Sequence, residues 1–494
     1  MAEHAQPVVA VVGHIDHGKT TLLDFIRKSA VAAREAGGIT QRVSAYEIGH
    51  KTPDGERFIT FIDTPGHEAF QSMRKRSANA ADIAILIVAA DDGVKPQTIE
   101  AKKAIEEAGV PMIVCFTKID KDTANLDRAK ESVLREGLYL EGLGGDVPWA
   151  AVSGKTGDGV PELLDLILLV AEVQGLASKP EAPFKGVVIE TARDARTGIS
   201  ATVIVKEGTL KTGAYALTTG AYAPLRSIEN FMGERVDSIT CGKPVRITGW
   251  TSEPAVGAEI RVVESKKDAE EAATVARTVA PLREVSDGAS EKTVVRIVLK
   301  ADTAGSLEAL RYELAKITHP DVDVLIADAG TGTVNENDVK VLIGFSPALI
   351  LGFGVKVDPS AKDLAERQHI PLETRAIIYE LSEWFAAEIK KHVPDRSAEA
   401  ITGVAKILKH FSTTGNKHVI GGKVEEGVLK KNDVVTIFRR GIEVGMGKVV
   451  NLQLQKANAD SVSAGMECGM QVDSKADIVG GDTLQAGGVK RRSE

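Results

Sequence analysis

A glycine-rich loop near the N-terminus constrains this fold more than any other feature of the chain. Residues 13–20 read GHIDHGKT, which fits the pattern G-x-x-x-x-G-K-[ST]. The loop lies between the all-apolar run Val8–Val12 and a helical pattern over Thr21–Arg27, a context that a chance glycine loop would rarely have. In such a loop the backbone N–H groups surround phosphates, the lysine binds their oxygens, and the threonine hydroxyl binds Mg²⁺. We therefore expect phosphate contacts from Gly13, His14, Ile15, Asp16, His17, Gly18, Lys19, Thr20 and Thr21.

A polar turn after a later apolar run fits the same site. Asp63–Gly66 (DTPG) follows the run Phe58–Ile62. Asp63 can reach Mg²⁺ through water, and the Gly66 N–H can reach a γ-phosphate because no side chain blocks its approach. An Asp-x-Pro-Gly turn is a common structural element by itself. Its position one strand after the phosphate loop indicates that it belongs to the same phosphate-binding site.

Two short segments further along indicate guanine recognition. Thr117–Asp120 (TKID) follows the run Met112–Phe116, and Ser153–Lys155 (SGK) follows the next one. Asp120 can accept hydrogen bonds from guanine N1 and N2, which adenine cannot satisfy. Loops at the carboxyl ends of parallel strands meet at one sheet edge, so the motifs predict a single GTP site. The expected guanine contacts are Thr117, Lys118, Asp120, Ser153, Gly154 and Lys155.

The alternation of apolar runs and helical patterns predicts a multidomain α/β protein. Before Ser178 it is typical of a doubly wound parallel sheet. After the linker-like Lys179–Pro183, short glycine-punctuated β segments predict a barrel or a sandwich. Glu373–His392 shows a long amphipathic helical pattern, which fits either core packing or a strut. We expect a P-loop GTPase domain at 7–178, a β-barrel at 183–264, an α/β sandwich domain at 290–372, a connecting helix at 373–393 and a second β-barrel at 398–487.

An internal repeat suggests that the two predicted barrels are related. Val205–Lys211 (VKEGTLK) recurs as Val424–Lys430 (VEEGVLK). Glu-Gly turns are common, so these letters alone are weak support. Because the flanking residues Ala201–Val205 and Val419–Val424 also match, we favour two related barrels.

Composition excludes several classes of protein. Among 494 residues, 43% are apolar and 26% charged, which excludes bulk disorder. No apolar run approaches the ~18 residues of a membrane span, and no secretory signal is visible. The isolated Cys115, Cys241 and Cys468 fit a reducing cytoplasm. The net charge of −8 hides a segment from Ser397 onward with 14 Lys and Arg against 11 Asp and Glu, a balance of +3.

These motifs resemble those of translational GTPases and, more closely, those of the bacterial translation initiation factor two family. EAGGITQ at 35–41, FIDTPGHEAF at 61–70 and VAADDGVKPQTIE at 88–100 are similar to that family nearly letter for letter. KAD at 300–302, GSLEAL at 305–310 and ECG at 467–469 resemble its later domains. Because the first strand begins at Val8, we expect the N-terminal extension of many bacterial members to be absent.

The resemblance implies roles for the switch residues. Thr40 would bind Mg²⁺ together with Thr20 and, through water, Asp63. His67 would act in catalysis by orienting the attacking water when the ribosome engages, and Ile15 and Ile39 would form an apolar gate that holds it away until then. Asp16 matches an aspartate that helps to place a monovalent cation in related enzymes, whereas His14 and His17 are interpreted as structural residues of the loop. The implied switch I residues are Gly38, Ile39, Thr40, Gln41 and Arg42.

The chain departs from the family pattern at two places. Thr117 stands where an asparagine usually donates to guanine N7 and braces the phosphate loop, and threonine can do only part of this. In the last barrel, Lys423 stands where a cysteine is expected, and QLQK at 453–456 replaces a Lys-Arg-x-Lys cluster. The resemblance implies that this barrel binds the formylmethionyl end of initiator tRNA through Lys456, Glu467, Cys468 and Gly469.

The implied function is that of a monomeric, cytoplasmic initiation GTPase. It would promote initiator formylmethionyl-tRNA binding to the small ribosomal subunit and then subunit joining. GTP would be hydrolysed to GDP, with Mg²⁺, on ribosome engagement. Other initiation factors would be partners, and membranes would not. One alternative is an elongation-type GTPase that delivers aminoacyl-tRNA, against which the α/β unit before the final barrel counts. Another is a GTP-gated ribosome-binding module with little hydrolysis, against which His67 and Thr40 count.

Overall fold

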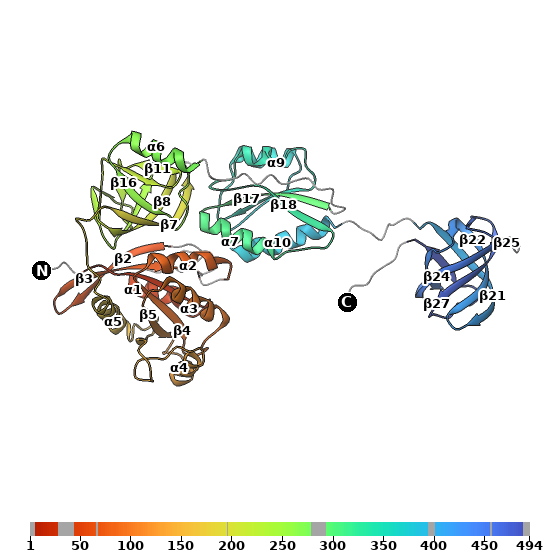
Figure 1. The fold of residues 1–494 in the computed structure, drawn as a ribbon, viewed down its shortest axis with the longest axis horizontal. Coiled ribbons are helices and arrows are strands. Elements are labelled where there is room, and N and C mark those ends of the chain that lie inside the picture. The colour runs from red at the N-terminus through yellow and green to blue at the C-terminus, as the bar shows by residue number, and fades with distance from the viewer. Residues whose placement is uncertain are drawn as a thin grey trace. The chain divides into compact units, whose positions relative to one another are not determined.

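The computed structural model describes residues 5–27, 44–65, 68–194, 196–277, 293–393, 401–454 and 457–487. The chain is a multidomain α/β protein and forms two compact units, residues 1–392 and 393–494 (Figure 1). The first unit contains three successive sheet-based parts, and the second is a β-barrel.

The first part is a six-stranded sheet with helices on both faces (Figure 1). The strand order is β2-β3-β1-β4-β5-β6, and every neighbouring pair is parallel except β2 with β3. The strands are β1 (Val8–Gly13), β2 (Ser44–Thr52), β3 (Gly55–Asp63), β4 (Ile83–Ala89), β5 (Met112–Thr117) and β6 (Trp149–Ala151). The helices are α1 (Lys19–Arg27), α2 (Gln71–Ala80), α3 (Pro96–Ala108), α4 (Leu126–Arg135) and α5 (Val160–Val173), with a 3₁₀ turn at Glu68–Phe70.

Two hydrophobic cores explain why the central strands are apolar throughout. One core joins Ile85 and Cys115 of the sheet to side chains of α1 and α5. The other joins Leu86 and Phe116 to side chains of α3 and α4. Successive residues of a strand point to opposite faces, so a sheet covered on both sides requires apolar residues at every position.

The edge strand β2 was not predicted from the sequence. Its letters, SAYEIGHKT, include charged and polar residues, and only Tyr46 is fully buried. An edge strand can form with few buried side chains. β2 is stabilised mainly by its pairing with β3 along residues 44–52. The apolar-run criterion therefore finds the buried strands and misses this one.

The second part is a closed antiparallel barrel, which decides between the barrel and the sandwich that the sequence left open. The order is β11-β10-β16-β7-β8-β15-β12-β13, and the chain runs directly from β11 to β12, so it bridges the two sides of this order. Helix α6 (Lys266–Arg277) follows the last strand. The strands are β7 (Lys185–Asp194), β8 (Gly198–Glu207), β9 (Thr209–Lys211), β10 (Tyr215–Thr218), β11 (Ala221–Pro224), β12 (Ile228–Glu229), β13 (Arg235–Val236), β14 (Ser238–Thr240), β15 (Pro244–Thr248) and β16 (Glu259–Val263).

The third part is a parallel four-stranded sheet in the order β18-β17-β19-β20. The strands are β17 (Thr293–Ala301), β18 (Val322–Thr331), β19 (Ala348–Phe353) and β20 (Leu372–Arg375). The helices are α7 (Ala304–Ala315), α8 (Glu336–Lys340), α9 (Pro359–Arg367) and α10 (Ile378–Lys391).

The predicted helix over 373–393 begins too early. Residues Leu372–Arg375 form β20, which pairs in parallel with β19, and the helix begins at Ile378. Glu373 and Thr374 fit the helical period of the sequence pattern, but pairing with a neighbouring strand overrides such local preference. The buried side chains of α10, among them Leu381 and Phe385, show that this helix packs against its own domain.

The parts of the first unit contact one another through charged and polar side chains. The Arg76 guanidinium on α2 lies 2.6 Å from the Glu308 carboxylate on α7. The Tyr312 hydroxyl on α7 donates to Glu68 at 2.6 Å. The buried carboxylate of Glu190, on β7, accepts from the Gly305 N–H at 3.3 Å. These contacts join the helix after the DTPG turn, the first barrel and the third part.

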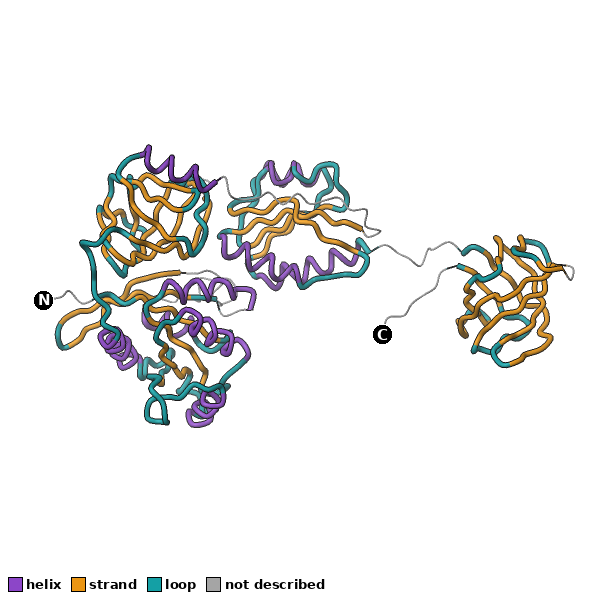
Figure 2. The backbone as a smooth tube through the Cα atoms, in the orientation of Figure 1, coloured by secondary structure: helices purple, strands orange, loops and turns teal. Residues whose placement is uncertain are grey.

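Within its described residues, the second unit consists of strands and loops only (Figure 2). It is a barrel with the same strand order as the first barrel. Its circle runs β21-β28-β23-β24-β27-β22 and closes where β22 pairs with β21. Gly208 and Gly427 take the same left-handed turn, at φ +78° and +67°, and the residues after them pair with β14 and β26. The two barrels therefore share their strand order and this glycine turn, as the internal repeat predicts. The strands are β21 (Gly403–Thr414), β22 (Lys417–Lys430), β23 (Val434–Arg439), β24 (Ile442–Leu454), β25 (Ala457–Asn458), β26 (Ser461–Ser463), β27 (Glu467–Ser474) and β28 (Thr483–Ala486).

Among the helices of the described ranges, none combines the length and the apolar character that crossing a membrane requires.

Candidate nucleotide-binding site

The predicted motifs meet at one edge of the first sheet. β1 ends at Gly13, β3 at Asp63 and β5 at Thr117, and these strands are parallel members of one sheet. In such sheets ligands bind outside the carboxyl ends of the strands. The topology therefore brings the phosphate loop, the DTPG turn and the TKID segment together.

The phosphate loop needs glycine at both of its ends. Gly13 has φ +153°, and a Cβ there would lie 2.7 Å from the Ile87 carbonyl oxygen. Gly18 has φ +86°, directly before α1 begins at Lys19. Asp16, at the tip, has φ +58°, a left-handed conformation that aspartate adopts more readily than most residues. The loop thus delivers the N-terminus of α1 to the sheet edge, where backbone N–H groups attract anions.

Lys19 is buried inside this loop. Its ammonium donates to the carbonyl oxygens of Gly13 at 3.0 Å and His14 at 2.5 Å. Burial lowers the pKa of Lys19 to about 8, and the nearby Asp63 carboxylate acts in the opposite direction. Lys19 is thus held at the centre of the loop by the backbone that surrounds it.

Thr117 braces the loop from β5. Its buried hydroxyl donates to the His17 carbonyl oxygen at 2.5 Å. This is the loop-bracing part of the role that the usual asparagine would have. A threonine hydroxyl offers one donor, so the bond to His17 occupies it.

Asp120, the predicted guanine-specificity residue, is held by a serine from the next loop. The Ser153 hydroxyl donates to the Asp120 carboxylate at 2.7 Å, and this bond lowers the pKa of Asp120. Ser153 Oγ also accepts from the Thr156 N–H at 3.0 Å. A Cβ on Gly154 would lie 2.8 Å from the backbone of Leu22, so only glycine lets this loop lie against α1.

His17 supports the loop. It is buried, and its Nδ1 accepts from the Ala89 N–H at 3.3 Å. Burial, together with the neighbouring His14 and Lys19, lowers the pKa of His17 to about 4. The ring is therefore neutral at pH 7.

Arg74 is a residue that the sequence analysis missed. Its guanidinium is fully buried and donates to the Pro65 carbonyl oxygen at 3.0 Å and to Glu100 at 2.5 Å. In the sequence it belongs to the stretch MRKRS, which has the character of a solvated helix face. Nothing in those letters distinguishes the buried Arg74 from the half-buried Arg76 and the exposed Lys75.

Two oxygen donors of this edge fit a Mg²⁺ ion. Asp63 is buried at the end of β3, and Thr20 follows Lys19 in the first turn of α1. A carboxylate and a hydroxyl are the hard oxygen ligands that Mg²⁺ prefers. Several predicted residues lie outside the described ranges: Gly38, Ile39, Thr40, Gln41, Arg42, Gly66, His67 and Lys456.

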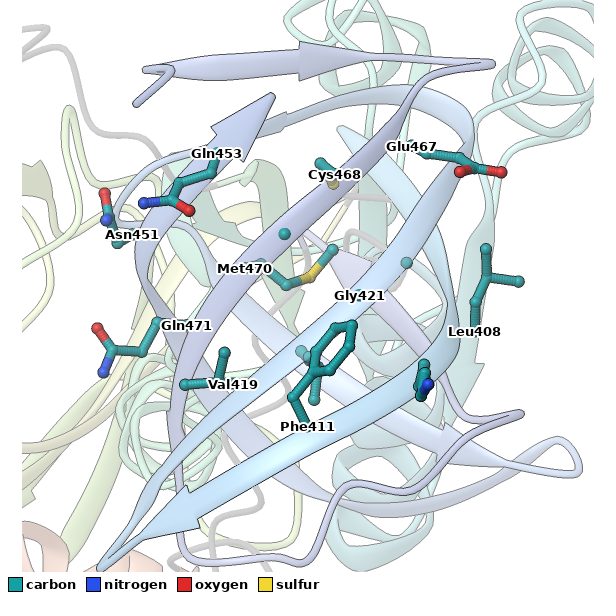
Figure 3. Close-up of a pocket in the computed structure, with 14 residues that line it drawn as sticks. Leu408, Phe411, Val419, Gly421, Asn451, Gln453, Glu467, Cys468, Met470 and Gln471 are labelled. Atoms are coloured by element: carbon teal, nitrogen blue, oxygen red, sulfur yellow. The ribbon is translucent and has the colours of Figure 1, made fainter. Parts of the chain in front are cut away.

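A second candidate site is a groove of about 810 Å³ on the terminal barrel (Figure 3). The predicted Glu467, Cys468 and Gly469 line it. Burial raises the pKa of the Cys468 thiol to about 11, so the thiol stays protonated. Lys423, one of the departures from the family pattern, lies opposite Glu467 in the β22–β27 register.

The walls of this groove are mainly apolar and amide-bearing. Figure 3 shows Asn451, Gln453 and Gln471 on one side and Phe411 with Met470 across the floor. Gly421 and Gly422 also line the groove, and a Cβ on Gly421 would lie 3.0 Å from the Phe411 ring. Gln453 stands at a position where the family usually has a cation, so in this chain an amide lines the groove there.

Comparison with known proteins gives matches along most of the chain. Residues 5–172 match the elongation factor Tu GTP binding domain, 183–263 elongation factor G domain 2, and 268–386 translation-initiation factor 2. Translation initiation factor IF-2 of Fervidobacterium nodosum is 40% identical over 97% of this chain and 71% of its own length. The corresponding factor of Rubrobacter xylanophilus is 38% identical over 97% and 70%.

The chain belongs to the translation initiation factor IF-2 family. The resemblance to the initiation factor two family is thus confirmed. The chain is accordingly an initiation factor with a GTPase domain that binds GTP and GDP with Mg²⁺. Among solved structures, GDP-bound aIF5B from Aeropyrum pernix is 27% identical, covering 98% of this chain and 92% of that one, with a TM-score of 0.46.

Proposed function

We propose that this IF-2 family member promotes the binding of initiator formylmethionyl-tRNA to the small ribosomal subunit and then subunit joining, and that it hydrolyses GTP when the ribosome engages. The observation that carries the GTPase half is the Asp120–Ser153 pair beside the braced phosphate loop. It places a fixed, ionised acceptor at the sheet edge where Lys19 lies. The ribosome, initiator tRNA and other initiation factors are the proposed partners.

Each residue of the nucleotide site has a role in this proposal. The phosphate-loop N–H groups and Lys19 hold the β- and γ-phosphates, and Asp120 accepts from guanine N1 and N2. Thr20, Thr40 and, through water, Asp63 would hold Mg²⁺, which neutralises phosphate charge when bound. Asp16 is the proposed neighbour of a monovalent cation.

Hydrolysis in this proposal depends on positioning. The attacking water must be oriented more than it must be deprotonated, because phosphoryl transfer needs little covalent chemistry from the protein. His67 is the proposed orienting residue, and Ile15 and Ile39 are the proposed gate that delays it. The site would therefore turn over slowly until a partner moves the histidine.

The groove of the terminal barrel is the proposed site for the aminoacyl end of the tRNA. The floor of Phe411 and Met470 suits an apolar amino-acid side chain, and the amides of Asn451 and Gln453 suit a neutral acyl group. The excess of Lys and Arg over Asp and Glu from Ser397 onward favours contacts with the phosphate backbone of the tRNA.

The GTPase proposal is tested by phosphate release with purified ribosomes, with and without initiator tRNA. We expect slow release from the factor alone and a large stimulation by ribosomes. The His67→Ala variant should lose the stimulation and keep GTP binding. If ribosomes fail to stimulate the wild-type chain, and His67→Ala changes nothing, a GTP-gated binding module would replace the proposal.

The tRNA proposal is tested by binding of formylmethionyl-tRNA, unformylated methionyl-tRNA and an elongator aminoacyl-tRNA. We expect formylmethionyl-tRNA to bind most tightly. Phe411→Ala should weaken that binding about tenfold, since aromatic anchors dominate such contacts. Ile442→Ala is a matched control, because Ile442 is 73% exposed on the same barrel and does not line the groove. Equal binding of all three tRNAs would favour the elongation-type alternative.

A further inference from the structure

The start of α3 contacts the phosphate loop directly and is linked to the DTPG turn through Arg74. Gln97 Oε1 accepts from the backbone N–H of Ile15 in the phosphate loop at 3.0 Å. Glu100, three residues later, accepts from Arg74, and Arg74 donates to the Pro65 carbonyl oxygen of the DTPG turn. Residues three apart lie on one face of a helix, so one turn holds both loops.

This helix turn is well fixed. Pro96 occupies its first position, where a preset φ suits the start of a helix. The buried Thr98 accepts from the Lys95 N–H at 3.2 Å. Helix α3 also packs on β1 and β4 in the centre of the sheet. A rigid element can therefore set a distance between the parts that it holds.

The second contact is the stronger of the two. The Arg74 guanidinium is fully buried, and a buried arginine is stable only with a paired carboxylate and further acceptors. Glu100 and the Pro65 carbonyl provide both. In the sequence, Pro65 precedes the proposed water-orienting His67 by two residues, so this contact ties Arg74 to the segment that leads to that histidine.

We propose that Gln97, Glu100 and Arg74 are positioning residues for GTP hydrolysis, which set the spacing between Ile15 of the phosphate loop and Pro65 of the DTPG turn. The inference rests on the proposed hydrolysis. None of the three needs to touch the nucleotide. Their effect would fall on the rate of the chemical step more than on GTP affinity, because a misplacement of about 1 Å can cost on the order of a hundredfold in rate.

Gln97 gives the cleaner test because it is only partly buried. Gln97→Ala and Gln97→Met both remove the acceptor of the Ile15 N–H, and methionine keeps the length of the side chain without adding a charge beside the phosphates. Single-turnover hydrolysis of bound GTP should slow about ten- to a hundredfold in both variants. The GTP dissociation constant should change by less than about threefold in both, because the phosphate contacts stay in place. A wild-type rate in either variant would overturn the proposal.

Glu100 is tested against a matched pair on the same two helices. Glu107 accepts from Lys75 at 2.7 Å and also joins α3 to α2, but both side chains are exposed. Glu100→Gln should slow hydrolysis, and Glu107→Gln should not. Thermal midpoints of both variants separate slow chemistry from loss of folding. Equal rates in the two variants would make the Arg74–Glu100 pair a structural contact only.

The double variant Gln97→Ala with Glu100→Gln tests the shared spacing. If both residues set one distance, the double variant should be about as slow as the slower single variant. Effects that simply multiply would contradict a common spacing. All rates are also measured without ribosomes. If ribosomes fail to stimulate wild type, the proposed function fails, and the positioning roles are still decided on the intrinsic rate.

Discussion

At the scale of single residues, Thr117 can perform only one of the two roles that an asparagine at this position would have. It occupies the end of β5 and uses its hydroxyl on the His17 carbonyl. An asparagine there could brace the loop and also donate toward a base, whereas threonine has one donor to give. The phosphate loop of this chain is therefore braced, and Asp120 is the residue that we propose to discriminate guanine.

Replacement of Thr117 by valine should destabilise the phosphate loop. Valine has the same shape but no hydroxyl, so the buried His17 carbonyl loses its donor. We expect the free energy of unfolding to fall by about 1–3 kcal/mol and GDP release to become faster. Urea denaturation and a GDP dissociation assay measure the two effects. Thr117→Ser keeps the hydroxyl and should stay close to wild type; a valine variant as stable as the serine variant would contradict the brace.

Asp120→Asn should change which base the site prefers. The amide presents one donor and one acceptor where the carboxylate presents acceptors only, which matches xanthine better than guanine. We expect GTP affinity to fall at least about 100-fold, since hydrogen bonds to a charged acceptor are lost, and XTP affinity to rise. Competition binding with both nucleotides measures the switch. Unchanged GTP binding would remove Asp120 from the site.

At the scale of elements, the sequence predicts the strands that are buried on both faces. It misses the strands whose formation depends on pairing with a neighbouring strand. The predicted runs Val8–Val12 and Met112–Phe116 lie in β1 and β5, each one residue shorter than the strand, because a strand covered on both faces must be apolar throughout. β2 and β20 were missed, because each depends on a neighbouring strand and carries polar residues. In the site, motif letters located the phosphate loop, but Arg74 gave no signal because its burial comes from packing between α2 and α3.

The repeated glycine turns of the two barrels allow a prediction at the same scale. A Cβ on Gly208 would lie 2.6 Å from the Ala182 carbonyl oxygen, and one on Gly427 would lie 2.3 Å from that of Thr402. Alanine at either position should cost about 1–2 kcal/mol for its left-handed backbone, with a similar further cost for the clash.

Gly213 and Gly465 are matched controls for these turns. They lie in the same two barrels at φ +99° and +88°, and a Cβ at either position would have no neighbouring atom within 4 Å. Their alanine variants should show only the backbone cost. Thermal unfolding measures the loss, and hydrogen exchange in β8 and β22 assigns it to a barrel. Equal losses at all four positions would mean that the clash contributes nothing.

At the scale of the whole first unit, a buried carboxylate ties the first barrel to the third part. Glu190 accepts from the N–H groups of Thr191 at 3.0 Å and Gly305 at 3.3 Å. Burial is the largest influence and raises the pKa of Glu190 to about 7 despite these bonds. The junction therefore favours the protonated carboxyl group.

This raised pKa predicts a pH dependence of defined sign. Above an unfolded pKa near 4.5 the unfolded chain releases the proton while the folded chain keeps it, so stability from this group falls as pH rises from about 4.5 to 7. By pH 8 the loss is about 3 kcal/mol. Glu190→Gln stays neutral and keeps an acceptor oxygen, so it should equal wild type at pH 5 and exceed it at pH 8.

The pKa of His17 changes stability with pH in the opposite direction to that of Glu190. The effect of Glu190 must therefore be measured by comparing wild type with Glu190→Gln. Its pKa of about 4 lies below the ordinary 6.5, so its contribution to stability falls as pH drops through that window. The two groups oppose each other between about pH 4.5 and 6.5. In wild type alone, the two pH dependences of the free energy of unfolding partly cancel. The difference between wild type and Glu190→Gln in urea denaturation isolates the contribution of Glu190. A difference that is constant from pH 5 to 8 would show that Glu190 is ionised in the folded chain throughout.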